Sequence, residues 1–86
     1  MPEISRFPGI VVAMYYNDHA PPHFHVRYGD REARISIESL EILDGRIPKR
    51  VSKSVRDWAE LNEAGLEKNW GLARRNQPLI PIKPLE

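Results

Sequence analysis

The stretch HFHVRYGDREARISIE, residues 23–38, contains two runs of alternating apolar and polar side chains, separated by Gly29 and Asp30. Alternation with a period of two is typical of β-strands that bury one face. A Gly-Asp pair between two such runs is a signal for a two-residue hairpin turn. The sequence therefore predicts two antiparallel strands, over residues 23–28 and 32–38.

The turn at Gly29 and Asp30 also fixes how the two strands pair, because a hairpin loop of given length sets the register. The pairs expected on the apolar face are Tyr28 with Arg31, Val26 with Ala33, and Phe24 with Ile35. The pairs expected on the polar face are Arg27 with Glu32, His25 with Arg34, and His23 with Ser36. One surface of the hairpin should therefore carry imidazole, guanidinium, hydroxyl and carboxylate groups together.

The rest of the chain completes what we expect to be a single domain over residues 1–86. The further expected elements are a strand over 9–16, a short hairpin over 40–47, a helical region over 48–76 and an extended arm over 77–86. Apolar residues at spacings of three and four predict the helical region, which Gly65 divides, and three prolines predict the arm. The expected fold class is α+β: a small antiparallel β-meander of three to four strands, with a C-terminal helix or helix pair packed on one face.

The composition excludes several kinds of site. The formal net charge is +1, so attraction to nucleic acid would have to come from a local patch and not from the overall charge. The chain has no cysteine, which excludes disulfides and cysteine-based zinc sites. We expect no signal peptide, no membrane contact and no cofactor, and therefore a cytoplasmic protein.

All three histidines of the chain lie in DHAPPHFHV, residues 18–26. His23 and His25 are two residues apart on the expected strand, so their side chains project from the same face. His19 in the preceding loop would be the third ligand of a metal site. The arginines expected beside and opposite His25 oppose this interpretation, because they repel a bound cation.

The same face also fits an anion, and this interpretation is favoured over a metal. The candidate residues for binding nucleic acid or phosphate are Arg27, Arg34, Ser36, Lys49, Arg50 and Lys53. Basic residues in the first turns of a helix oppose the helix dipole, which suggests that another interaction recruits them. His23 and His25 would then act as general acid and base in a metal-independent ribonuclease. The structural alternative is a solvated polar face without a function.

Several segments resemble domain-of-unknown-function family 4160, a family of small bacterial proteins. The similar segments are ISRFPGI (4–10), DHAPPHFHVRYG (18–29), IPKR (47–50), DWAEL (57–61) and NWGLA (69–73). The resemblance implies no established activity. It does imply a second small protein, encoded by a neighbouring gene, in a two-gene module such as a toxin–antitoxin pair. Ala20, Asn62 and Gly65 depart from the family pattern.

The function expected from the sequence is therefore a bacterial interaction or nucleic-acid-binding module. Its candidate partners are RNA and the neighbour-encoded protein. The strand expected over residues 9–16 is apolar on both faces, which makes a homodimer a further candidate. A metal-independent ribonuclease and a histidine metal-binding protein remain alternatives, and the sequence leaves open whether the protein is an enzyme.

Overall fold

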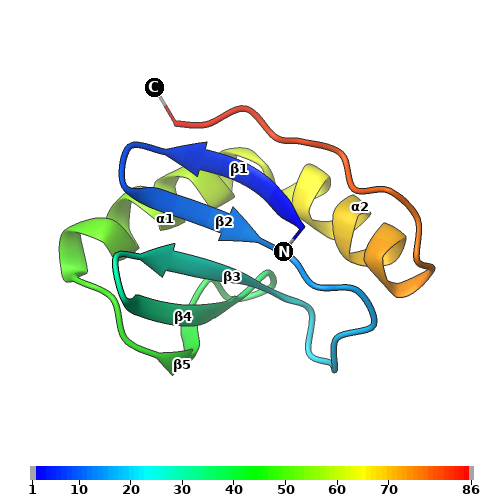
Figure 1. Cartoon of the computed structure of the whole chain (residues 1–86), viewed down its shortest axis with the longest axis horizontal. Coiled ribbons are helices and arrows are strands. Elements are labelled where there is room, and N and C mark those ends of the chain that lie inside the picture. The colour runs from blue at the N-terminus through cyan, green and yellow to red at the C-terminus, as the bar shows by residue number, and fades with distance from the viewer. Residues whose placement is uncertain (1, 86) are drawn as a thin grey trace.

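Five strands and two helices form the fold of the computed structural model, which describes residues 2–85 (Figure 1). The elements are β1 (Glu3–Phe7), β2 (Ile10–Ala13), β3 (His23–Tyr28), β4 (Arg31–Ser36), β5 (Ile42–Gly45), α1 (Lys49–Leu61) and α2 (Glu63–Arg74). The strands form one sheet in the order β1-β2-β3-β4-β5, and each pair is antiparallel. The expected α+β fold with a β-meander and C-terminal helices is confirmed, with five strands instead of three to four.

The hairpin of β3 and β4 has the register that the Gly29 turn predicts. The pairs are His23 with Ser36, Phe24 with Ile35, His25 with Arg34, Val26 with Ala33, Arg27 with Glu32, and Tyr28 with Arg31. Gly29 has a φ of +62°, which glycine adopts without steric cost and which tight hairpin turns require. The predicted arrangement of both faces of this hairpin is therefore confirmed.

The N-terminal half of the sheet differs from the expected strand over residues 9–16. The strand β2 ends at Ala13, because the chain then leaves the sheet and the backbone N–H of Asn17 donates to the carbonyl of Ala73 at the end of α2. A first strand, β1, precedes it and was not expected. Ile4 and Phe7 of β1 are both buried although they are three residues apart, because the register shifts between Glu3 and Ser5.

The region after β4 also differs from expectation. Residues 40–47 contain the single strand β5 and not a hairpin of their own. The turn lies earlier, where the N–H of Leu40 donates to the carbonyl of Ser36, and it joins β4 to β5. Strand β4 itself ends at Ser36, two residues earlier than expected. The helical region divides at Asn62 and not at Gly65. The side-chain amide of Asn62 donates to the carbonyl of Trp58, and this side-chain hydrogen bond ends α1 after Leu61.

The core lies between the sheet and the two helices. Trp58 of α1 is fully buried, and its ring contacts Phe7 and Phe24 edge-on at 5.5 and 6.0 Å between centroids. Edge-to-face pairs of this kind stabilise a core beyond the area that they bury. Neither helix within residues 2–85 has the length and apolar character needed to cross a membrane.

The segment after α2, residues 77–85, contains neither helix nor strand, and we call it the arm. Figure 1 shows that it runs back past α2 and along the outer side of β1. The N–H of Ile82 donates to the carbonyl of Ile4 at 2.7 Å, and the indole N–H of Trp58 donates to the carbonyl of Lys83. Asn69 is buried and bonds to both the N–H and the carbonyl of Ile80. The arm is therefore attached to both layers of the fold.

Candidate functional site

A loop between β2 and β3 places the carboxylate of Asp18 against two histidines of β3. The Nε2 atoms of His23 and His25 lie 2.9 and 3.0 Å from the same oxygen, Oδ2 of Asp18. The His23 side chain is fully buried, whereas His25 and Asp18 are 12% and 21% exposed. One ligand atom from each of the three residues lies within 4.8 Å of the others. We call this group the Asp-His-His cluster.

The ring of His23 is held from both sides. Its Nδ1 lies 2.7 Å from the carbonyl oxygen of Pro21, and a carbonyl only accepts, so Nδ1 carries a hydrogen and donates it. Trp70 of α2 packs against the same ring, with 5.3 Å between centroids. The Nε2 atom of His23 is therefore directed at Asp18, with its orientation fixed by the backbone and by α2.

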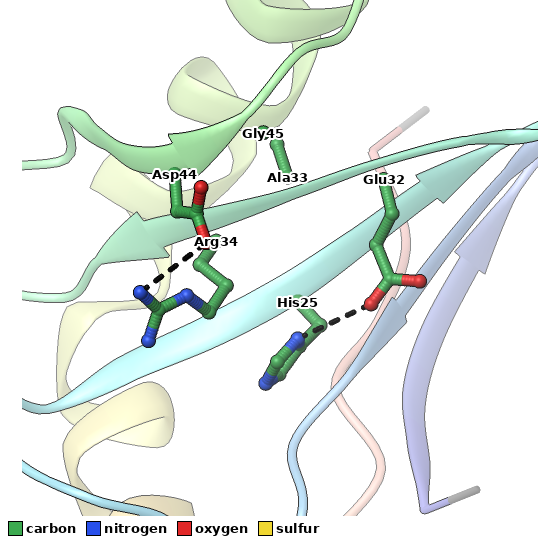
Figure 2. Close-up of a pocket in the computed structure, with 6 residues that line it drawn as sticks. All are labelled: His25, Glu32, Ala33, Arg34, Asp44 and Gly45. Carbon is green, nitrogen blue, oxygen red and sulfur yellow. Dashed lines mark ion pairs between the residues drawn. The ribbon is translucent and has the colours of Figure 1, made fainter.

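The ring of His25 has a similar arrangement on the polar face of the sheet. Figure 2 shows its Nδ1 directed toward Glu32, and the distance to Oε2 of Glu32 is 3.4 Å. This Nδ1 is buried and forms no hydrogen bond within residues 2–85, so its contact with Glu32 is electrostatic. The ring of Tyr15 lies edge-on to it at 4.3 Å between centroids. Both histidines thus present Nε2 to Asp18 and Nδ1 to a neighbouring oxygen acceptor.

Asp18 is an ionised carboxylate at neutral pH. Burial acts to raise its pKa, but hydrogen bonds from His25 and from the backbone N–H of His19, together with the charge of His23, hold the pKa below its ordinary value of 3.8. Oδ1 takes the His19 N–H at 2.9 Å, which leaves Oδ2 for the two imidazoles. The carboxylate therefore ties the loop to β3.

The structure gives Asp18 the position that the metal interpretation assigned to His19. The His19 residue is exposed, and its backbone rather than its ring contacts Asp18. Among the residues that the structure describes, Asp18, His23 and His25 form the one group of three or more potential ligand residues that comes together. A carboxylate five residues before His23 was visible in the sequence, but its approach depends on the path of the loop.

The six candidate phosphate-binding residues do not form one surface. Arg34 forms an ion pair with Asp44 at 3.5 Å, and Arg27 one with Glu32 at 4.0 Å (Figure 2 shows the first of these). Ser36 is buried, and its hydroxyl oxygen accepts the backbone N–H groups of the following turn. The others belong to α1: Lys49 is exposed, Arg50 donates to the hydroxyl of Tyr28, and Lys53 forms an ion pair with Asp57.

These ion pairs change the charge of the polar face. Three carboxylates, those of Asp18, Glu32 and Asp44, accompany the two guanidinium groups of Arg27 and Arg34. Sequence analysis identified the arginines on this face but not Asp44, because the register of β5 was unknown. In the neutral form in which histidines bind a metal, they leave three carboxylates against two guanidinium groups, which weakens the electrostatic objection to a bound cation.

Two imidazole nitrogens and one carboxylate oxygen are ligands that Zn²⁺ and other divalent transition metals accept. Three protein ligands are also the number that zinc sites with an exchangeable position use. The chemistry of the cluster is therefore that of a cation site with an open position. Without a cation, the same contacts require at least one shared proton.

Comparison with known proteins identifies the family. A search of curated proteins and a search of solved structures found no match. The sequence model of the family described as Domain of unknown function (DUF4160) matches residues 9–71 of the 86. This segment contains the whole Asp-His-His cluster, strands β2 to β5 and most of both helices. The chain therefore belongs to the DUF4160 family.

Proposed function

We propose that this protein binds one divalent transition-metal ion, with Zn²⁺ as the favoured metal, through the Asp-His-His cluster. The observation that carries the proposal is the convergence of Nε2 of His23, Nε2 of His25 and Oδ2 of Asp18 within 4.8 Å. The metal-binding alternative, which sequence analysis placed below anion binding, is thus the one that the geometry supports best.

The positions of the hydrogens support a cation between these atoms. The Nδ1 of His23 must carry a hydrogen to bond to Pro21, so a neutral His23 has only a lone pair at Nε2. A lone pair 2.9 Å from an ionised carboxylate oxygen is repulsive. Either a proton or a metal ion must lie there. Metal ions displace protons from such sites, because the ligands bind in their deprotonated forms.

The surroundings of both histidines match those of metal ligands. A metal-bound imidazole almost always donates its second N–H to a carbonyl or carboxylate, which fixes the tautomer and the ring orientation. Pro21 provides that acceptor for His23 at 2.7 Å, and Glu32 lies 3.4 Å from the Nδ1 of His25.

Zinc titration of purified protein by isothermal calorimetry tests the proposal, with metal content measured after dialysis. We expect one Zn²⁺ per chain in the wild type. We expect His25→Ala and Asp18→Asn to weaken binding by about a hundredfold or more, since loss of an outer partner alone costs about 10–100-fold. His19→Ala is the matched control, because His19 is exposed in the same loop, and it should bind as the wild type does.

A thermodynamic readout complements the titration. Free Zn²⁺ at about 100 times its dissociation constant should raise the free energy of unfolding by about 2.7 kcal/mol in the wild type and not in His25→Ala. No stoichiometric binding in the wild type would refute the proposal. So would equal affinities in wild type and His25→Ala.

Nucleic-acid binding is a second candidate, supported by a different surface. Lys49, Lys53 and Arg56 line one hollow on α1, away from the cluster. This candidate includes the bacterial, cytoplasmic two-gene module that the family resemblance implies. RNA binding measured at several salt concentrations tests it, because loss of phosphate contacts reduces the salt dependence. A Lys49→Ala/Lys53→Ala/Arg56→Ala variant should bind more weakly than the control Lys68→Ala, and equal binding would exclude this surface.

The ribonuclease alternative has less support. A general acid or base must reach the proton that it transfers, but the His23 side chain is fully buried. Arg27 and Arg34 each have a carboxylate partner on the protein.

A further inference from the structure

A second hollow, separate from the pocket in Figure 2, shares Asp18 with the Asp-His-His cluster. It is lined by Asn17, Asp18, His19, Ala20 and Arg74, and we call it the Arg74 hollow. The loop after β2 forms one wall and the end of α2 the other. Asp18 belongs both to this wall and to the proposed metal site, so a molecule in the hollow would lie next to a ligand of the bound metal.

The charges around this hollow are positive once a metal is bound. Arg74 forms no ion pair with any carboxylate in residues 2–85; its guanidinium group lies 5.9 Å from the centroid of Trp70. The exposed imidazole of His19 is a second nitrogen donor on the wall. Asp18 supplies the one carboxylate of the lining, and a metal ion would neutralise it. An unpaired guanidinium beside a divalent cation attracts an anion.

We propose that the Arg74 hollow binds a phosphate group next to the metal, with Arg74 as its protein ligand. The inference rests on the proposed metal site, because the cluster supplies three ligands and zinc commonly takes a fourth from solvent or substrate. Guanidinium groups bind phosphate oxygens through two parallel hydrogen bonds, which suits a tetrahedral anion held between Arg74 and the metal. The ligand is either inorganic phosphate or the phosphate of a monoester.

The packing of Arg74 links it to the cluster. Its guanidinium lies over Trp70, and Trp70 packs against His23 at 5.3 Å between centroids. On the other wall, the side-chain amide of Asn17 donates to Asn76, and its backbone N–H donates to Ala73. Two hydrogen bonds therefore join the two walls of the hollow in the absence of a bound molecule.

The experiment uses Co²⁺ as the metal probe, since it accepts the ligands that zinc accepts and its visible absorption changes when a ligand is exchanged. Co²⁺-loaded protein is titrated with inorganic phosphate in one arm and with phenyl phosphate in the other. The variant is Arg74→Ala. The matched control is Arg75→Ala, because Arg75 is the exposed neighbour and does not line the hollow.

We expect saturable phosphate binding in at least one arm for the wild type and for Arg75→Ala. Arg74→Ala should bind that ligand at least about tenfold more weakly, the effect of losing a charge-assisted hydrogen bond, while it still takes up one Co²⁺ per chain. The arm that binds more tightly identifies the source of the phosphate group.

Three results would overturn the inference. If Co²⁺ binds but neither phosphate ligand alters its absorption, the metal site stands and the phosphate site fails. If Arg74→Ala binds phosphate as tightly as the wild type, Arg74 is not the ligand. If Co²⁺ does not bind to the wild type, the proposed function fails first, and the phosphate site fails with it.

Discussion

The Nδ1 atom of His25 lies 3.4 Å from Oε2 of Glu32 (Figure 2), whereas Nε2 of the same ring contacts Asp18. This contact follows from the hairpin register. Arg27 pairs with Glu32 and His25 pairs with Arg34, so Glu32 lies one pair away from His25 on the same face. The two side chains are diagonal neighbours on one face of the sheet, where long side chains reach each other. Glu32 is therefore placed to fix which nitrogen of His25 carries the hydrogen.

Replacing Glu32 by alanine tests this positioning role. Glu32→Ala should weaken zinc binding by about 10–100-fold, the usual cost of removing the acceptor behind a ligating histidine. Its effect on the free energy of unfolding should be small, since Glu32 and its ion-pair partner Arg27 are both about half exposed. Calorimetric titration and urea unfolding give the two values. Glu41→Ala is the control, and an equal loss of affinity in both variants would contradict the role.

Two glycines with positive φ predict a contrast in stability. A Cβ at Gly45 would lie 2.2 Å from the carbonyl oxygen of Glu32, and φ is +86°. Gly45→Ala should cost about 3 kcal/mol or more, the sum of left-handed strain and of a steric clash. A Cβ at Gly29 meets nothing within 4 Å, so Gly29→Ala should cost only the strain of about 1–2 kcal/mol. Urea unfolding of both variants checks the order, and equal costs would contradict it.

The attachment of the arm can be measured at Asn69. Asn69→Ala removes both side-chain hydrogen bonds to Ile80, each 2.8 Å long, and should lower the free energy of unfolding by about 1–3 kcal/mol. Hydrogen exchange at the Ile80 amide should accelerate more than exchange within α1. The control is Gln77→Ala, because the Gln77 side chain is exposed and makes no hydrogen bond within residues 2–85, so its loss should cost less than about 0.5 kcal/mol. Unchanged exchange at Ile80 would show that other contacts hold the arm.

The pKa of Asp18 predicts how the metal-free protein responds to acid. Because this pKa is lower in the folded chain than its ordinary value of 3.8, ionised Asp18 stabilises the fold above pH 3.8. That contribution should disappear as the pH falls through the folded pKa. In the presence of a chelator, the difference in the free energy of unfolding between wild type and Asp18→Asn should shrink on acidification. A difference that is independent of pH would contradict the assignment.

The sequence was sufficient for the parts of the site that depend on local pairing. A Gly-Asp turn fixes the register by its length alone, so the placement of His25 opposite Arg34 followed from the sequence and is confirmed. The period of β1 could not be recognised in the same way, since a bulge near Ser5 places its buried Ile4 and Phe7 out of alternation.

The remaining parts of the site depend on contacts between distant segments. His23 is buried because Trp70 of α2 covers it, and nothing in the alternation of β3 indicates which helix covers which end of the strand. Asp18 reaches the histidines because the loop is anchored at Asn17 by the carbonyl of Ala73. The alternation identified a polar face, but only these contacts turned part of it into an enclosed cluster.

The hydrogen bond from Ile82 to Ile4 has a consequence for colloidal stability. An uncovered outer strand is a template on which other chains can add, and proteins shield such strands to stay dispersed. Here the arm covers the outer side of β1. The unpaired edge of the sheet is therefore chiefly β5, where Ile42 and Leu43 are exposed. Loss of the arm would open a second such template and free the indole N–H of Trp58, and precipitation on storage would be the visible sign.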